Sequence, residues 1–188
     1  MKRYFHFLRI IFVTAIITGV LYGQDGRWQK YSNKEFGYTI KYLAGWKITE
    51  AKPRKDNKAA YGGEILLPGE LQKISFSDTS DRYWQATLAI RVLELPKGKT
   101  FAQWMKEYEA SDTTDFNPVE QVIDTIVSGR PAKKATLFNF DHTGQELILK
   151  HKNGVMLFSY EGQNPNDRRN EWHMEIFRKM IKSYEQKN

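Results

Sequence analysis

The chain has 188 residues, with 29 Lys and Arg against 22 Asp and Glu, and it contains no cysteine. Disulfides, thiolate metal sites and thiol catalysis are therefore excluded. Three of the seven net positive charges belong to Lys2, Arg3 and Arg9, which leaves +4 for residues 24–188. Because this part is only mildly basic and has no dense Lys/Arg stripe, we expect no nucleic-acid partner, although an anionic membrane surface could attract it peripherally.

The first 23 residues have the composition of a secretory signal peptide. Lys2, Arg3 and Arg9 flank an uncharged and mainly apolar run over residues 10–21, which is typical of a signal peptide. The run is shorter than the roughly 20 residues that a membrane-spanning helix needs, which favours a cleaved signal peptide. An uncleaved membrane anchor is the alternative. We expect cleavage after Gly23 and a periplasmic or secreted protein, with residues 24–188 forming one domain.

Strands are predicted in the first half of the domain from period-two alternation of apolar and polar residues. The clearest alternations cover residues 37–42 and 84–92. Shorter strands are expected at residues 45–49, 64–67 and 73–77. The segment 84–92 is expected to be a long central strand.

A helix is predicted to start after Thr100, because apolar residues change there to a helical spacing. Phe101, Trp104 and Tyr108 share one face with Met105. Thr100 followed three residues later by Gln103 forms the pattern of a capping box, in which each side chain bonds the other residue's backbone N–H.

The second half of the domain is predicted to consist of strands at residues 121–127, 132–140, 146–151 and 155–160, followed by a helix over 167–184. Asn153 and Gly154 are expected at the two central positions of a hairpin turn. Strands joined by hairpins, with two helices, predict an α+β fold in which helices cover a mainly antiparallel sheet. The predicted buried core is Trp46, Leu88, Ile90, Phe101, Met105, Phe138, Ile148, Phe158, Phe177 and Met180.

Three histidines remain after Gly23, and each has a structural interpretation. His173 is expected at the boundary of the core on the last helix, and His151 at a solvated strand end. His142 follows Asp141 in a segment typical of a turn. The alternative is a metal or small-ligand site, conceivably a weak hydrolase, that uses Asp141, His142 and His151.

Other catalytic signatures are missing from the sequence. There is no Gly-rich phosphate loop, no G-x-S-x-G elbow and no His-x-x-x-His pair. The acidic residues are expected in loops, with no closely spaced pair in an apolar setting that would raise one pKa. Asp78 and Asp81 lack the spacing of an EF-hand, and a solvated loop is expected there. We therefore expect no enzymatic activity and no cofactor.

Residues 31–48, which read YSNKEFGYTIKYLAGWKI, resemble the opening of PsbP-like domains. This family includes the extrinsic photosystem II subunit and exported proteins of non-photosynthetic bacteria. Leu43 stands where a proline is usual in the family. Residues 137–140 and 160–163 and the last helix also fit the family's layout, so that the resemblance covers about residues 28–184.

The resemblance implies an α/β/α sandwich with a central antiparallel sheet, and a role in binding or assembly without known enzymatic activity. Fold alone does not determine function. We expect a monomeric, non-catalytic domain that binds or stabilises an envelope protein or complex. The alternative is a protein that binds a small ligand or a metal ion such as calcium. Four tryptophans are candidate anchors for a partner, although helical and strand periodicity favours a core position for the second and third: Trp28, Trp84, Trp104 and Trp172.

Overall fold

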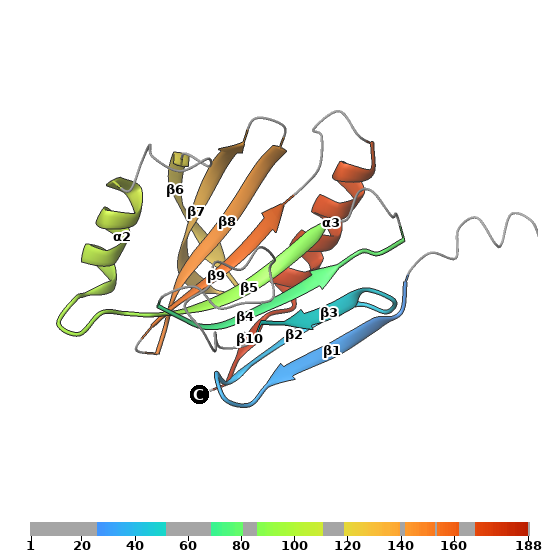
Figure 1. Cartoon of the computed structure of the whole chain (residues 1–188), viewed down its shortest axis with the longest axis horizontal. Helices are drawn as coiled ribbons and strands as arrows, with labels where there is room; N and C mark the ends of the chain where they lie inside the picture. Colours follow the sequence, from blue (N-terminus) through green and yellow to red (C-terminus); the bar gives the residue numbers. More distant parts are fainter. Residues whose placement is uncertain are drawn as a thin grey trace, which may run out of the picture.

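The computed structural model describes residues 26–51, 69–80, 86–110, 119–139, 142–152, 154–161 and 168–187. These residues form ten strands and two helices (Figure 1). In chain order they are β1 (Trp28–Asn33), β2 (Tyr38–Leu43), β3 (Lys47–Glu50), β4 (Glu70–Ser77), β5 (Thr87–Glu94), α2 (Phe101–Ala110), β6 (Val119–Val127), β7 (Arg130–Asn139), β8 (His142–His151), β9 (Gly154–Glu161), α3 (Arg168–Lys182) and β10 (Glu185–Gln186).

The strands form two sheets. A seven-stranded sheet has the order β3-β4-β5-β9-β8-β7-β6, and a three-stranded sheet has the order β1-β2-β10. Neighbouring strands in both sheets are antiparallel. The expected α+β class is confirmed. Strand β5 is an interior strand of the large sheet, as predicted for the segment 84–92.

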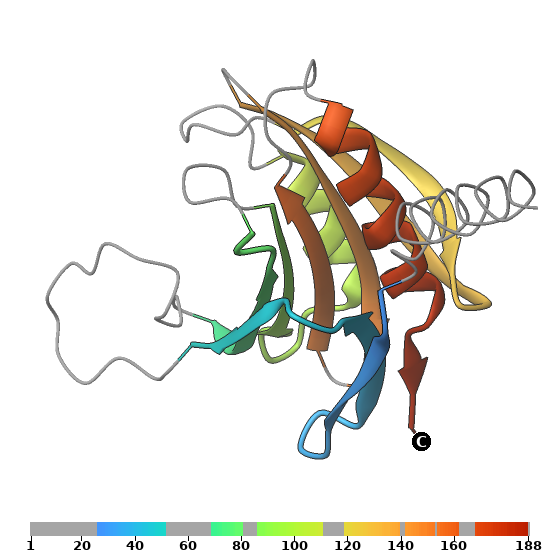
Figure 2. The ribbon, with the colours of Figure 1, turned by 90° about the vertical axis from the view of Figure 1, so that its right-hand side faces the viewer.

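Both faces of the large sheet carry buried side chains. Successive side chains of a strand point to opposite sides, so neighbouring residues enter different clusters. On β8, Ile148 packs in a cluster with Met105 of α2, whereas its neighbour Leu149 packs in a second cluster with Phe177 of α3. Figures 1 and 2 show α2 and α3 on opposite sides of the sheet. The three-stranded sheet shares the α3 side, where Ile40 of β2 joins the same cluster.

The predicted core is confirmed at eight positions. Phe101 is half-buried on α2, and the side chain of Phe138 lies outside the described residues. The buried residues are Trp46, Leu88, Ile90, Met105, Ile148, Phe158, Phe177 and Met180.

Two strands were not predicted, and both belong to the small sheet. β1 is mostly exposed along its length, so it has no apolar alternation by which a sequence pattern could reveal it. β10 is two residues long and pairs with β2 through Glu185 and Gln186. The strand expected at residues 64–67 and the residue Trp84 lie outside the described residues.

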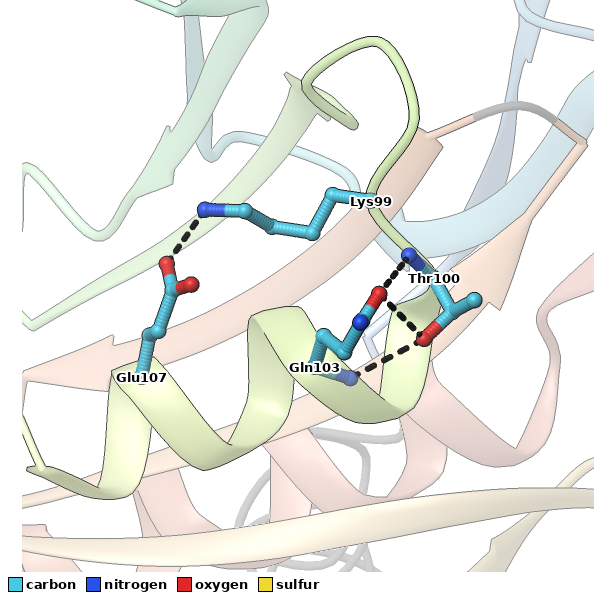
Figure 3. Close-up of polar contacts among 4 residues, drawn as sticks. All are labelled: Lys99, Thr100, Gln103 and Glu107. Carbon is cyan, nitrogen blue, oxygen red and sulfur yellow. Dashed lines mark hydrogen bonds and ion pairs between the residues drawn. The ribbon is translucent and has the colours of Figure 1, made fainter.

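The capping box at the start of α2 is confirmed (Figure 3). The backbone N–H of Thr100 donates to Oε1 of Gln103 at 2.8 Å, and the N–H of Gln103 donates to Oγ1 of Thr100 at 3.2 Å. An ion pair between Lys99 and Glu107 spans the first two turns. The two hydrogen bonds of the capping box satisfy backbone N–H groups that have no partner inside the helix.

The predicted position of the β8–β9 turn was wrong by one residue. His151 pairs with Gly154, and Lys152, which follows His151, takes a positive φ of 46°; Asn153 lies outside the described residues. Gly154 is instead the first residue of β9, opposite Glu94 of β5. A Cβ at position 154 would lie 2.5 Å from the carbonyl oxygen of Leu93. Glycine is therefore required here by the close approach of β5, and not by the turn.

We predict that Gly154→Ala destabilises the protein by about 2–3 kcal/mol, because the added methyl group must push β5 and β9 apart. Gly98→Ala is the matched control, since Gly98 has a positive φ of 81° but open space around its Cβ position. The control is expected to lose only about 1 kcal/mol from backbone strain. Urea denaturation followed by circular dichroism measures both values. Equal losses in the two variants would contradict the role assigned to Gly154.

Candidate functional site

An open groove of about 740 Å³ lies where three segments meet: the β2–β3 connection, the end of β4 and the start of α3. Leu43 at the end of β2 and Gly45 and Trp46 in the connection line one side, and the first turns of α3 contribute Arg169 and Trp172. Gly45 has a φ of 92°, in the left-handed region that glycine adopts without strain. This turn carries the chain from the small sheet to the large sheet and places Trp46 in the groove.

The wall of the groove is a row of three rings with His173 in the middle. The ring of Trp46 is centred 6.2 Å from that of His173, and the ring of Trp172 is 4.8 Å away on an edge-to-face contact. Trp46 is buried, whereas Trp172 is 39 % exposed. The row therefore presents one solvent-accessible indole that is supported from behind by buried rings.

Asp78, just after β4, anchors the polar part of the groove. Its Oδ2 lies 2.9 Å from Nε2 of His173, and its Oδ1 accepts a hydrogen bond from the backbone N–H of Ser80 at 2.9 Å. Burial acts to raise the pKa of Asp78, but the hydrogen bonds from His173 and Ser80 together outweigh it and hold the pKa below its usual value. The carboxylate is therefore ionised at neutral pH and fixes the orientation of the His173 ring.

The geometry at Asp78 differs from that of a catalytic triad. In a triad the serine hydroxyl contacts the imidazole nitrogen that the carboxylate does not use. Here Ser80 contacts the carboxylate of Asp78, on the far side from the imidazole of His173. The described groups of the groove are thus arranged to hold rings in place and to present an aromatic surface.

Two of the three candidate site residues, His142 and His151, lie far apart. His142 and His151 are the first and last residues of the ten-residue strand β8, which at about 3.3 Å per residue separates them by about 30 Å. Asp141 and the side chain of His142 lie outside the described residues. Among the residues that the structure describes, no group of three His, Asp or Glu side chains could hold a metal ion.

His151 was expected at a solvated strand end, and that expectation was wrong. Its side chain is only 3 % exposed, because the β1–β2 turn and β10 cover this end of β8. Burial, together with the charges of Lys152 and Arg130, lowers its pKa. His173, in contrast, lies at the edge of the core as predicted.

The expectation that acids lie in loops was also wrong. Glu70 on β4 and Glu146 on β8 are both buried, and Arg91 on β5 lies between them, 2.9 Å from Oε1 of Glu70 and 3.7 Å from Oε1 of Glu146. Tyr108 of α2 and Ser159 of β9 each donate a hydrogen bond of 2.6 Å to Glu146. Burial, followed by the charge of Glu146, raises the pKa of Tyr108.

The signal for this buried network was present in the sequence. Glu146 falls on the same side of β8 as the buried Ile148, two residues later, so the strand alternation places it inward. A buried carboxylate needs a charged or hydrogen-bonding partner, and Arg91 is the partner on a neighbouring element. Asp78 likewise belongs to a specific contact with His173, where a solvated loop was expected.

The four tryptophans considered as anchors fall in different places. Trp172 lines the groove, and Trp28 is 37 % exposed on β1. Trp104 is half-buried and stacks between Phe101 and the ring of Tyr108 on α2. The second groove indole, that of Trp46, was predicted only as a core residue.

Comparison with known proteins gives a match in structure and none in sequence: no protein-family model matches the chain, and neither does any curated protein. The solution structure of cyanobacterial PsbP (CyanoP) from Synechocystis sp. PCC 6803 matches with a TM-score of 0.55, over 87 % of this chain and 96 % of that one. The fold is PsbP-like. At 16 % identity, the likeness establishes the fold alone.

A second solved structure with similarity to the chain is that of LpqN, a protein involved in cell envelope biogenesis of Mycobacterium tuberculosis. It is 8 % identical, with a TM-score of 0.48 over 89 % of this chain and 88 % of LpqN. Within the described part of the chain, neither helix is long and apolar enough to cross a membrane.

We predict that Asp78→Asn lowers the free energy of unfolding by about 1–2 kcal/mol at pH 7, because a charge-assisted hydrogen bond to His173 is lost. In the native protein this contribution is present above the unfolded pKa of Asp, about 3.9, and disappears as the pH falls through the lowered pKa of Asp78. Chemical denaturation at pH 7 and pH 3 measures both effects.

Asp124→Asn serves as the control, since the Asp124 side chain is 89 % exposed in its ion pair with Lys133 and such pairs stabilise little. At pH 7 the loss of unfolding free energy relative to wild type should be larger for Asp78→Asn than for Asp124→Asn. At low pH the two losses should become equal. An Asp78→Asn variant as stable as the control at pH 7 would contradict the account of this contact.

Proposed function

We propose that this chain is a non-catalytic, PsbP-like domain that works outside the cytoplasm and binds a protein of the cell envelope through the groove at Trp46 and Trp172. In this proposal the seven-stranded sheet and the helices on its two faces form an α/β/α sandwich. The single observation that carries the proposal is the row of three rings, with one indole exposed on a firmly packed support.

An exposed tryptophan backed by buried rings has the properties of a binding anchor. Trp is enriched among the residues that contribute most to protein–protein affinity, provided that it sits in a well-packed surrounding. Trp172 lies on α3, which is fixed to the sheet by the buried residues Phe177 and Met180. The indole is therefore largely oriented before binding, which lowers the entropy lost on association.

The polar groups of the groove support binding more than catalysis. The imidazole of His173 and the N–H of Ser80 are both engaged with Asp78. A nucleophile next to a general base is the usual arrangement of covalent catalysis, and the contacts of Ser80 differ from it. The aromatic wall of the groove is formed by Trp46, His173 and Trp172, so a partner with an apolar segment would suit it.

The volume of the groove favours a second candidate, a small organic ligand. Sites for such ligands are mostly apolar clefts of roughly 300–1,000 Å³ with a few polar groups, and the groove of about 740 Å³ falls in this range. Native mass spectrometry of the purified protein tests it directly, because a retained ligand adds a defined mass that Trp172→Ala should remove. The metal site at Asp141 and His142 stays a prediction from the sequence, and metal analysis of the purified protein tests it.

We predict that a photo-crosslinking amino acid at Trp172 or Thr79, introduced in cells that make the protein, captures one and the same envelope protein. The two positions line the groove from different elements, α3 and the end of β4, so that a partner seated in the groove should reach both. Lys106 is the control position, since it is exposed on α2 on the opposite side of the large sheet. Gel shift followed by mass spectrometry identifies the adducts.

Adducts from both groove positions, absent from position 106, are the expected result. Failure of both groove positions to crosslink, in a protein that is exported and folded, would contradict the proposal. An adduct from position 106 alone would place the partner on the α2 side instead.

A further inference from the structure

Strand β6 is the end strand of the seven-stranded sheet, at the opposite edge from β3 (Figure 2). Among the described residues it pairs with β7 on one side and with no strand on the other. Its register with β7 is regular from Gln121 to Val127, after a shift next to Val119. These residues therefore form a regular sheet edge, and the groove lies on the other side of the sheet, by β3 and β4.

The β6–β7 turn determines which backbone groups point out of this edge. Ser128 and Gly129 have φ values of 48° and 77°, which is typical of a two-residue type I′ turn. The two residues that flank such a turn, of which Val127 is the one on β6, form a hydrogen-bonded pair. Hydrogen-bonded and non-hydrogen-bonded pairs alternate along an antiparallel ladder. The residues whose N–H and C=O groups point away from β7 are therefore Val122, Asp124 and Ile126.

The side chains of this edge are apolar on both faces of the sheet. Val122 packs in the cluster of α2 and Val127 in that of α3, and side chains alternate along the strand. Ile126 is accordingly 72 % exposed on the α2 side, and Ile123 is 45 % exposed on the α3 side. Residues 121–127 include no Lys, Arg or Pro, with which natural proteins commonly protect a free edge. Such an edge favours pairing with another strand.

Charge and symmetry favour a second copy of β6 as that strand. A strand that continues this edge must be apolar on both of its faces, as β6 itself is. Asp124 is the one charged residue of the run, and its Oδ1 lies 3.0 Å from Nζ of Lys133 in the same chain. A strand with several charges would find no counter-charge here, whereas a second copy brings its own ion pair. A two-fold axis also makes the two strands antiparallel, like every other neighbouring pair in the sheet.

We propose that the protein forms a symmetric dimer through β6, in which two seven-stranded sheets join into one continuous sheet. This differs from the monomer expected from the sequence, and it does not depend on the function proposed for the groove. A pairing centred on Asp124 would place two carboxylates opposite each other, which is unfavourable. The pairing is therefore centred one residue to either side, on Ile123 or on Thr125. In both arrangements Asp124 faces an apolar residue of the second copy, Val122 or Ile126.

Sedimentation velocity of the purified protein at low and high concentration tests the dimer. We expect a dimer that dissociates on dilution, because a contact made by one pair of strands is small. Ile123→Lys should abolish the dimer, since it places a charge in an apolar contact on both sides of the two-fold axis. Leu71→Lys is the matched control, because Leu71 is 46 % exposed but lies on β4, an interior strand of the sheet. This variant should dimerise as wild type does, and circular dichroism shows that both variants are folded.

Single cysteines locate the two-fold axis, because the chain has no cysteine of its own. On the free side of β6, residues 123 and 125 belong to non-hydrogen-bonded pairs, in which opposed side chains come close enough for a disulfide. After oxidation with copper-phenanthroline, either Ile123→Cys or Thr125→Cys should give a covalent dimer on a non-reducing gel. Leu71→Cys should give none.

Three results would overturn the proposal. The first is a wild-type protein that stays monomeric at every concentration, which would leave the β6 edge to a strand of another protein. The second is a dimer that Ile123→Lys leaves intact, which would place the contact on another face. The third is the absence of a disulfide-linked dimer from both Ile123→Cys and Thr125→Cys.

Discussion

The antiparallel ladder of β5, β9 and β8 is the feature on which the rest of the structure depends. Eight successive residues of β5 pair with β9, and eight of β8 pair with the other side of β9. At the first residue of β9 the backbones of β5 and β9 approach closely, and Gly154 lies against the carbonyl oxygen of Leu93. Since side chains alternate along these strands, the same three strands build the two opposed clusters of the core.

The two faces of the ladder differ in character, and this difference bears on function. The α2 face contains the buried charges of Glu70, Arg91 and Glu146, of which Arg91 lies beside both carboxylates and Glu146 accepts a hydrogen bond from Tyr108. A buried ion pair contributes little net stability but constrains geometry, because removing one member leaves the other uncompensated. The α3 face is largely apolar and also carries the small sheet, and the groove opens at the start of α3.

Helix α3 thus holds one wall of the groove on a rigid element. Its apolar residues were recognisable from the sequence, and Ile176, Phe177, Met180 and Ile181 are all buried, as is Tyr184 just after the helix. The residues of interest are Trp172 and His173 near its start, where the helix lines the groove. Helix ends at the margin of a core are partly exposed yet fixed in position, which suits binding groups.

The sequence predicted most of the large sheet and both helices, because these elements have regular periodicity and recognisable caps such as Thr100 with Gln103. In the small sheet it predicted β2 but neither of the strands beside it, since β1 is exposed and β10 is too short to show a pattern. Contacts between distant segments were also beyond sequence reasoning. The Asp78–His173 contact joins residues 95 positions apart, and the burial of His151 depends on elements at both chain ends, where Gln186 and Phe36 meet. The Asn-Gly dipeptide led to a wrong turn position, because the glycine is required by the close approach of β5 and not by the turn.

Native-state hydrogen exchange tests the central claim, that the β5–β9–β8 ladder is the most stable part of the fold and supports the rest. We expect the amides of residues 88–92 and 156–160 to exchange most slowly, through global unfolding, because both neighbouring strands and both helices cover them. The amides of β1 and β10 in the small sheet should exchange faster, through local opening. Protection of β1 or β10 equal to that of the ladder, or exchange of the ladder by local opening, would contradict the account.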